Sequence, residues 1–178
     1  MNARGTETFD IFLQPGEFYF GDQQTRIQTL LGSCVAITLW HPRLQQGGMC
    51  HFILPGRSGH FYRRHDGRYA NDAVALFMRE LSRNHTHPSE YEVKLFGGGH
   101  MFSKHQHHAP TSVDIGQRNI EAGRRLLREH AFLIKAEHVG GDGHRNIVFD
   151  LACGHVWVKH VPELAMAVEN LSGREGGV

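Results

Sequence analysis

The sequence predicts a single α/β (α+β) domain, a layered sandwich of a mixed, largely antiparallel sheet with two main helices. Its apolar patterns follow the order strands, helix, strand, helix, strands, which is typical of layered domains. Hairpin-like patterns favour antiparallel pairing over a doubly wound parallel sheet. A chain of 178 residues can build one substantial core, and neither a repeat nor a linker divides it. Residues 1–178 are therefore expected to form one domain, with a flexible C-terminal tail at about residues 172–178.

The first half of the chain carries three strand patterns. Residues 26–31 (RIQTLL) and 35–40 (VAITLW) are rich in Ile, Val, Leu and Thr, a composition typical of strands. A third pattern, over residues 47–55 (GGMCHFILP), opens at a glycine pair and closes at a proline. Residues 56–68, which follow, are expected to form a basic loop.

Two helices are predicted from apolar spacing. Residues 71–84 place apolar side chains at i, i+3, i+4 and i+7, and Asn71 or Asp72 is expected to cap this helix. These apolar side chains are Val74, Phe77, Met78 and Leu81. Residues 115–131 form the second predicted helix, with Asp114 as its cap. Its buried face would carry Ile120, Gly123 and Leu127.

Further strand patterns surround the second helix. Residues 91–96 (YEVKLF) precede it and end at a triple glycine, and residues 132–139 (FLIKAEHV) alternate after it. Residues 145–161 are expected to form a hairpin, whose first strand carries Ile147, Phe149 and Leu151 on one face. A short helix over residues 162–171 would end the domain.

Charge and hydropathy exclude several classes of protein. The formal net charge is +1, which does not provide the positive field expected of a general nucleic-acid binder. The longest apolar runs are too short to span a bilayer, so no membrane insertion is predicted. The N-terminal segment is polar and carries acidic residues, unlike a secretory signal. We therefore expect a cytoplasmic protein.

The cysteine and histidine content leaves one question open. Three cysteines without a CxxC spacing favour reduced thiols over disulfides or a cysteine-rich zinc site. Fifteen histidines are many for this length. They gather at His85 and His87, and again at His100, His105, His107 and His108. These clusters are either solvated loops or a metal site, but no HExxH pattern is present and no metal or other cofactor is predicted.

Cys34 is the candidate nucleophile. It directly follows Gly32 and Ser33, which permit a tight turn that aims backbone N–H groups at a developing oxyanion. The alternative interpretation is a small core residue, because an apolar strand follows it. Cys50 and Cys153 are expected to be a buried inert thiol and an incidental turn residue.

His51 is the candidate base. If the hairpin turn is centred between Pro42 and Arg43, paired residue numbers add up to 85, and Cys34 lies directly opposite His51. Pro42 fits the favoured two-residue turns poorly, so a longer loop would shift this register. Thr29 and Ser33 are the local hydroxyls that would orient the imidazole, although Thr29 is also an ordinary strand residue.

At these residues the sequence resembles the CheD family, the chemoreceptor glutamine deamidases of bacterial chemotaxis. The segment TLLGSCVAITLWHPRLQQGGMCHFILP carries the most specific part of the resemblance, the Gly-Ser-Cys run followed by Gly-Gly-Met-x-His. The remaining segments are RYANDAVALFMREL, KLFGGGHMF, DIGQRNIEAGRRLL and GGDGHRNIVFDLACGHVWV. Together they cover about residues 25 to 160.

The resemblance implies a fold similar to the deamidase domain of the cytotoxic necrotizing factors. It implies hydrolysis of glutamine side chains to glutamate in methyl-accepting chemotaxis proteins, through a cysteine thioester and without a cofactor. The implied catalytic set is Cys34, His51 and Thr29. The resemblance also implies an alternative function, a regulatory module that binds and stimulates the CheC phosphatase.

Overall fold

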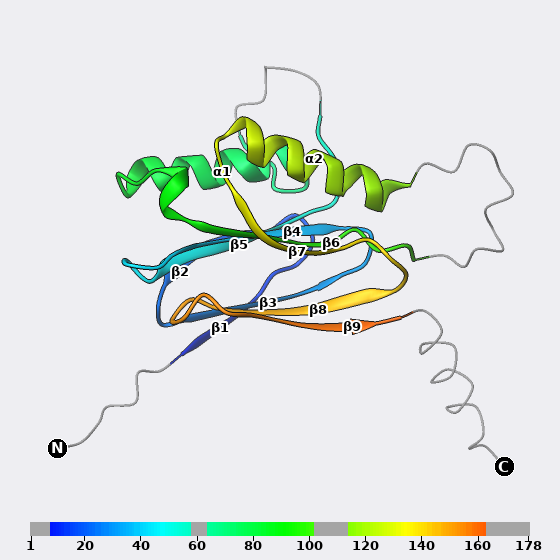
Figure 1. Cartoon of the computed structure of the whole chain (residues 1–178), viewed down its shortest axis with the longest axis horizontal. Coiled ribbons are helices and arrows are strands. Elements are labelled where there is room, and N and C mark those ends of the chain that lie inside the picture. Colours follow the sequence, from blue (N-terminus) through cyan, green and yellow to red (C-terminus); the bar gives the residue numbers. More distant parts are fainter. Residues whose placement is uncertain (1–7, 58–63, 102–113, 163–178) are drawn as a thin grey trace, which may run out of the picture.

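The computed structural model describes residues 8–57, 64–101 and 114–162 (Figure 1). The strands are β1 Phe9–Phe12, β2 Phe18–Asp22, β3 Thr25–Leu31, β4 Val35–His41, β5 Gln46–Phe52, β6 Glu92–Gly97, β7 Ile134–Val139, β8 His144–Asp150 and β9 Val156–Val161. The helices are α1 Ala70–Arg83, the short 3₁₀ helix η1 Pro88–Glu90 and α2 Ile115–Glu129.

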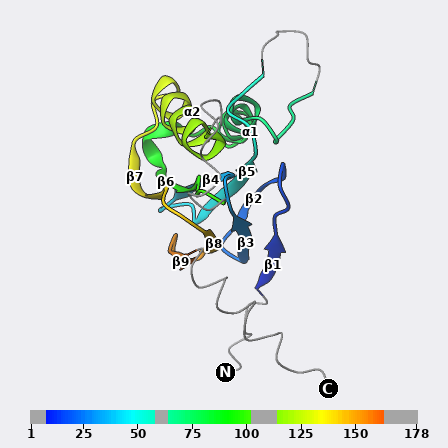
Figure 2. The ribbon, with the colours of Figure 1, turned by 90° about the vertical axis from the view of Figure 1, so that its right-hand side faces the viewer.

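These elements form three layers. A five-stranded sheet has the order β2-β5-β4-β6-β7, and a four-stranded sheet has the order β1-β3-β8-β9. Within each sheet one pair of strands is parallel, β6 with β7 and β1 with β3, and the others are antiparallel. Both long helices cover one face of the five-stranded sheet, and the four-stranded sheet covers the other (Figures 1 and 2). The predicted layered α+β sandwich with two main helices is therefore confirmed.

Strands β4 and β5 lie at the centre of the molecule, and their side chains alternate between two cores. One core lies between the helices and the five-stranded sheet, and it includes Val35, Ile37, Cys50 and Phe52. The other lies between the two sheets, and it includes Ala36, Met49 and residues of β3 and β8. Because both faces are covered, these strands are buried almost throughout rather than alternating between buried and exposed residues. A side chain on the inter-sheet face can reach the opposite sheet.

The predicted apolar faces are confirmed by burial. Val74, Phe77 and Leu81 of α1 are buried and Met78 packs against the same core. Ile120, Gly123 and Leu127 of α2 are buried. Ile147, Phe149 and Leu151 belong to the inter-sheet core. The predicted strands correspond to β3 to β9, whereas β1 and β2 had no counterpart in the sequence-based prediction.

One of the two predicted helix caps is confirmed, and the other is wrong. The Asp114 side chain accepts a hydrogen bond from Gln117 N at 3.0 Å, which confirms the predicted cap of α2. The predicted cap of α1 by Asn71 or Asp72 is wrong, because this helix begins at Ala70 and Tyr69 is its N-cap without a side-chain bond. Asp72 instead forms an ion pair with Arg57 at 2.5 Å.

Within the described ranges, no helix is long and apolar enough to cross a membrane. The predicted helix over residues 162–171 and the predicted tail at about residues 172–178 lie almost entirely outside the described part of the chain, which ends at residue 162.

Candidate active site

The three predicted site residues come from three different segments. Thr29 lies in β3 of the four-stranded sheet, and His51 lies in β5 of the five-stranded sheet. Cys34 directly precedes β4. Cys34 packs against the inter-sheet core, as do Ala36 and Met49. The alternation of β5 places His51 on the same face as Met49.

Thr29 and His51 are joined across the two sheets. The Thr29 hydroxyl lies 2.8 Å from His51 Nδ1 and donates a hydrogen bond to the carbonyl oxygen of Leu13, also at 2.8 Å. A hydroxyl has a single proton, so the bond to Leu13 leaves its oxygen as the acceptor for His51. His51 therefore carries its proton on Nδ1, and Nε2 has a free lone pair.

The free nitrogen of His51 lies in an apolar environment. His51 is 1% exposed, and Nε2 has no hydrogen-bond partner among the described residues. Burial lowers the pKa of His51 to about 4, and this effect outweighs the opposing influence of the Leu13 backbone and of Glu17. At neutral pH the imidazole is therefore uncharged and can accept a proton at Nε2.

The predicted direct pairing of Cys34 with His51 is wrong. His51 pairs with Ala36, and paired residue numbers in this hairpin add up to 87 rather than 85. The reason is a longer turn, since β4 ends at His41 and β5 begins at Gln46, and Gln45 N bonds back to the carbonyl oxygen of His41. Because the shift is even, it keeps both side chains on one face of the sheet. Cys34 directly precedes β4, and in the continued register it would be a diagonal neighbour of His51, a relation that in a regular sheet places Cα atoms about 7–8 Å apart. No hydrogen bond joins His51 Nε2 to Cys34 or to any other described residue.

Cys34 itself is partly buried. Burial raises the pKa of its thiol, and its own backbone N–H opposes this effect more weakly. Cys34 is therefore a neutral thiol in the resting protein, on the same face of the sheet as the neutral imidazole of His51. It needs a base to become a nucleophile.

Hydrogen bonds from two other segments hold the turn that carries Cys34. Gly98 N donates to the carbonyl of Cys34 at 2.7 Å, and Gly99 N donates to the carbonyl of Gly32 at 2.8 Å. The side-chain amide of Asn119 donates to the carbonyl of Ser33 at 3.1 Å. All three carbonyls of the Gly-Ser-Cys turn are therefore bonded toward the body of the domain.

Two backbone N–H groups of the same turn take no part in backbone pairing among the described residues. Within the described residues, the backbone N–H groups of Ser33 and Cys34 donate to no carbonyl oxygen. The Met101 side chain covers Gly32, and a Cβ added to Gly32 would lie 2.7 Å from the Met101 sulfur. Two backbone amides that donate to no carbonyl oxygen, beside a nucleophile, are the arrangement that stabilises an oxyanion.

The triple glycine makes this support possible. Gly97 and Gly98 adopt φ values of 105° and 66°, which residues with side chains rarely adopt. The backbone of Gly116 in α2 packs directly on Gly98, where an added Cβ would lie 2.6 Å from the Gly98 oxygen. Sequence reasoning identified the triple glycine as the end of a strand but missed its contact with Cys34, and it missed Asn119 altogether.

The other two cysteines lie away from this chemistry. Cys50 is fully buried in the helix-side core, and burial raises the pKa of its thiol to about 12. Cys153 is exposed, in the segment between β8 and β9. Both placements agree with the sequence-based expectation of a buried thiol and a turn residue.

Two described histidines, in β7 and β9, make hydrogen bonds within the domain. His138 Nδ1 accepts a hydrogen bond from Arg145 Nε at 2.8 Å, and His160 Nε2 donates to the carbonyl of Asp142 at 2.7 Å. No group of three or more potential metal ligands occurs among residues 8–57, 64–101 and 114–162. His105, His107 and His108 of the predicted cluster lie outside the described residues.

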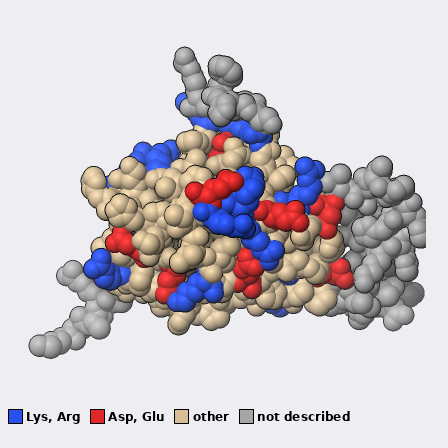
Figure 3. Space-filling model, turned by 45° about the horizontal axis from the view of Figure 1, so that its top comes forward, with Lys and Arg blue, Asp and Glu red and all other residues tan. Residues whose placement is uncertain are grey.

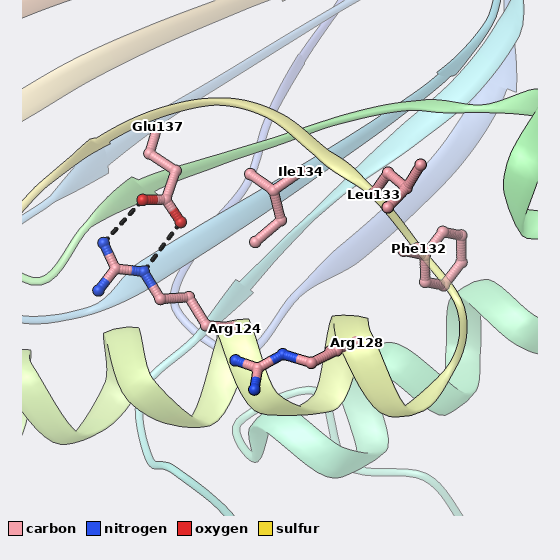
Figure 4. Close-up of a pocket in the computed structure, with 6 residues that line it drawn as sticks. All are labelled: Arg124, Arg128, Phe132, Leu133, Ile134 and Glu137. Atoms are coloured by element: carbon pink, nitrogen blue, oxygen red, sulfur yellow. Dashed lines mark hydrogen bonds and ion pairs between the residues drawn. The ribbon is translucent and has the colours of Figure 1, made fainter.

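An open pocket elsewhere on the surface contains none of the candidate residues. It lies between the end of α2 and β7, and an Arg124–Glu137 ion pair at 2.7 Å forms one side of it (Figure 4). Its other lining residues are Arg128, Phe132, Leu133 and Ile134. On the helix-bearing face, basic and acidic side chains are intermixed (Figure 3). The candidate site is therefore the Cys34 turn and not this pocket.

Comparisons with known proteins agree on one family. The family described as "CheD chemotactic sensory transduction" matches residues 53–160. A probable chemoreceptor glutamine deamidase CheD of Pseudomonas savastanoi pv. phaseolicola is 50% identical over 156 residues, 86% of this chain and 85% of that protein. A probable chemoreceptor glutamine deamidase CheD 3 of Dechloromonas aromatica is 43% identical over 175 residues, 97% of this chain and all of that protein.

The family match begins just after His51, but the alignment with the Dechloromonas protein spans 97% of the chain and so includes the segment from Thr29 to His51. Among solved structures, the Bacillus licheniformis hypothetical protein YfiH gives a TM-score of 0.41 at 13% identity, over 67% of this chain and 49% of that chain. This last likeness is too low to bear on fold or function. On the sequence comparisons, the chain belongs to the CheD family.

Proposed function

We propose that this protein hydrolyses glutamine side chains of chemoreceptors to glutamate, with Cys34 as nucleophile, His51 as general base and Thr29 as the residue that orients His51. The observation that carries the proposal is the hydrogen bond between Thr29 and His51 Nδ1, because it leaves Nε2 unprotonated on the face where Cys34 lies. The names of the relatives, chemoreceptor glutamine deamidases, supply the substrate class.

The first half of the reaction forms an acyl-enzyme. His51 Nε2 takes the thiol proton of Cys34 as the sulfur attacks the carboxamide carbon of the glutamine. The N–H groups of Ser33 and Cys34 donate to the oxyanion of the tetrahedral intermediate. The carbon–nitrogen bond then breaks, His51 gives its proton to the nitrogen, and ammonia leaves. A thioester between Cys34 and the receptor side chain remains.

The second half regenerates the enzyme. His51, again neutral, removes a proton from water as the water oxygen attacks the thioester carbon. The carbon–sulfur bond breaks, the sulfur of Cys34 takes back the proton, and the side chain leaves as glutamate. The sum is one amide and one water converted into one carboxylic acid and one ammonia, and these steps need no cofactor.

Replacement of the sulfur tests the assignment. The variant Cys34→Ala is expected to release no ammonia from receptor protein above the uncatalysed rate. Cys153→Ala should keep wild-type activity, because this side chain is exposed and lies in the segment between β8 and β9. Mass spectrometry of receptor peptides would show the roughly one-dalton gain of amide to acid only with the wild type and Cys153→Ala. Deamidation by Cys34→Ala at the wild-type rate would contradict the proposal.

Binding to CheC and the location of the protein stay predictions from the sequence. Binding to a CheC phosphatase would be seen as retention of this protein by immobilised CheC, and a regulatory role would be seen as faster phosphatase turnover. If Cys34→Ala still stimulates the phosphatase, the binding role is separate from the proposed deamidation. The cytoplasmic location is likewise a prediction from the sequence.

A further inference from the structure

Asn119 is a fully buried polar residue on the apolar face of α2, and the catalytic steps above do not use it. It is 0% exposed and lies among core residues of the same helix, such as Ile120. A polar side chain in this position is expected to make specific hydrogen bonds.

Both donors of the Asn119 amide go to the two segments that carry the candidate catalytic pair. Its nitrogen donates to the carbonyl of Ser33 at 3.1 Å, and Ser33 directly precedes Cys34. The same nitrogen donates to the carbonyl of Ile53 at 2.7 Å, and Ile53 lies two residues after His51. One side chain therefore bridges the turn of the nucleophile and the strand of the base.

This bridge lies where the backbone ladder stops. The last pair between β4 and β5 is Val35 with Phe52, so the next pair in that register would be Cys34 with Ile53. No backbone pairing holds that position, and Asn119 supplies the connection from a different layer of the domain. The spacing between the Cys34 turn and the segment after β5 is thus set by a side chain of α2.

We propose that Asn119 is a positioning residue that fixes the Cys34 turn relative to the His51 strand, and that it acts on the rate of the chemical step rather than on substrate binding. This inference rests on the proposed function of Cys34 and His51. The Asn119 oxygen has no hydrogen-bond partner among the described residues, which offsets part of what its two donors contribute to stability. The main effect of the Asn119 amide is therefore to fix the position of the Cys34 turn rather than to stabilise the fold.

The test compares Asn119→Ala with Leu126→Ala. Leu126 is a buried residue of the same helix, and no hydrogen bond connects its side chain to the Cys34 turn, so its truncation matches the loss of packing. Since small misplacements of reacting groups cost about 100-fold in rate, Asn119→Ala should lower kcat by about 10- to 100-fold and leave KM within about threefold. Leu126→Ala should leave kcat near the wild-type value. Equal kcat values for Asn119→Ala and the wild type would overturn the proposal.

A second measurement needs no receptor and separates this proposal from the proposed function. In a Cys153→Ala background, the rate of Cys34 alkylation by iodoacetamide is followed from pH 6 to 10. Asn119→Ala should displace this pH profile, whereas Leu126→Ala should not, because only the former releases the turn. Superimposed profiles would overturn the positioning role. Retention of activity by Cys34→Ala would overturn the proposed function and with it the effect on kcat, and the alkylation profiles would still decide whether Asn119 fixes the Cys34 turn.

The wild-type protein provides a third measurement if the variants do not fold. In NMR spectra the two side-chain amide protons of Asn119 should exchange slowly with solvent, because both are buried in hydrogen bonds. Alkylation of Cys34 should shift these resonances. Rapid exchange or unshifted resonances would contradict the proposal.

Discussion

The Thr29 hydroxyl lies 2.8 Å from His51 Nδ1, and this contact joins the two sheets at the candidate active site. A residue of β3 thereby selects the tautomer of a histidine of β5. The single hydroxyl proton of Thr29 goes to the Leu13 carbonyl, so the Thr29 oxygen can only accept a hydrogen bond from the His51 ring.

Removal of this hydroxyl is expected to impair catalysis without loss of the fold. Thr29→Val keeps the shape of the side chain and leaves the Nδ1 proton without its acceptor, which stabilises the ring most when His51 is protonated in the transition state. A hydrogen bond to a charged group contributes about 1.5–3 kcal/mol. As each 1.4 kcal/mol is tenfold, kcat for ammonia release should fall about 10- to 100-fold. Thr29→Ser retains the hydroxyl and should stay within a few-fold of the wild type. If Thr29→Val and Thr29→Ser have equal activity, the hydroxyl does not orient His51.

The burial of His51 is expected to make stability depend on pH. Its pKa is about 4 in the folded protein, against about 6.5 in the unfolded chain, so the unfolded state binds more protons between these values. The stability that depends on neutral His51 is therefore fully present above pH 6.5, and it is lost as the pH falls toward 4. This group alone should lower the free energy of unfolding by about 2 kcal/mol between pH 7 and pH 5.

Urea unfolding of the wild type and His51→Gln at both pH values measures this effect. The other histidines and the carboxylates titrate in both proteins, so their contributions cancel in the difference. His51→Gln should lose about 2 kcal/mol less than the wild type on acidification. An equal loss in both proteins would show that His51 is not held neutral by its surroundings.

The apolar pattern was sufficient to predict the layers and most strands, but not the length of the hairpin turn. Both a two-residue and a four-residue turn fit the segment around Pro42, and the observed turn depends on Gln45 adopting a φ of 48°, which its residue type does not signal. The resulting two-residue shift was harmless to the site because it preserves the face of each side chain. An odd shift would have separated Cys34 from His51.

The contacts between layers could not be predicted from the sequence. β1 and β2 are short and partly exposed, so their patterns lack the alternation that identifies β3. The bond from Thr29 to His51 depends on how the two sheets stack, which no local pattern specifies. Asn119 did leave a signal, since it falls on the helix face otherwise occupied by Gly116, Ile120 and Gly123. A polar residue there indicates a buried hydrogen bond.

Gly116 and Gly123 are expected to respond in opposite ways to substitution by Ala. Both lie inside α2, where Ala is favoured over Gly by about 1 kcal/mol. At Gly116 a Cβ would lie 2.6 Å from the backbone oxygen of Gly98, which cannot move without displacing the Cys34 turn. At Gly123 the nearest atom is a terminal methyl of Leu95 at 3.2 Å, which can shift. Overpacking against backbone costs about 1–3 kcal/mol and therefore exceeds the helix preference only at Gly116.

Thermal unfolding and ammonia release together measure this difference. Gly116→Ala should be destabilised by about 1–2 kcal/mol and should also lose activity, because α2 can retreat from Gly98 only by moving Asn119 away from Ser33. Gly123→Ala should be as stable as the wild type or slightly more so, with unchanged activity. If Gly116→Ala is as active and as stable as Gly123→Ala, the close contact of α2 with the triple glycine does not support the Cys34 turn.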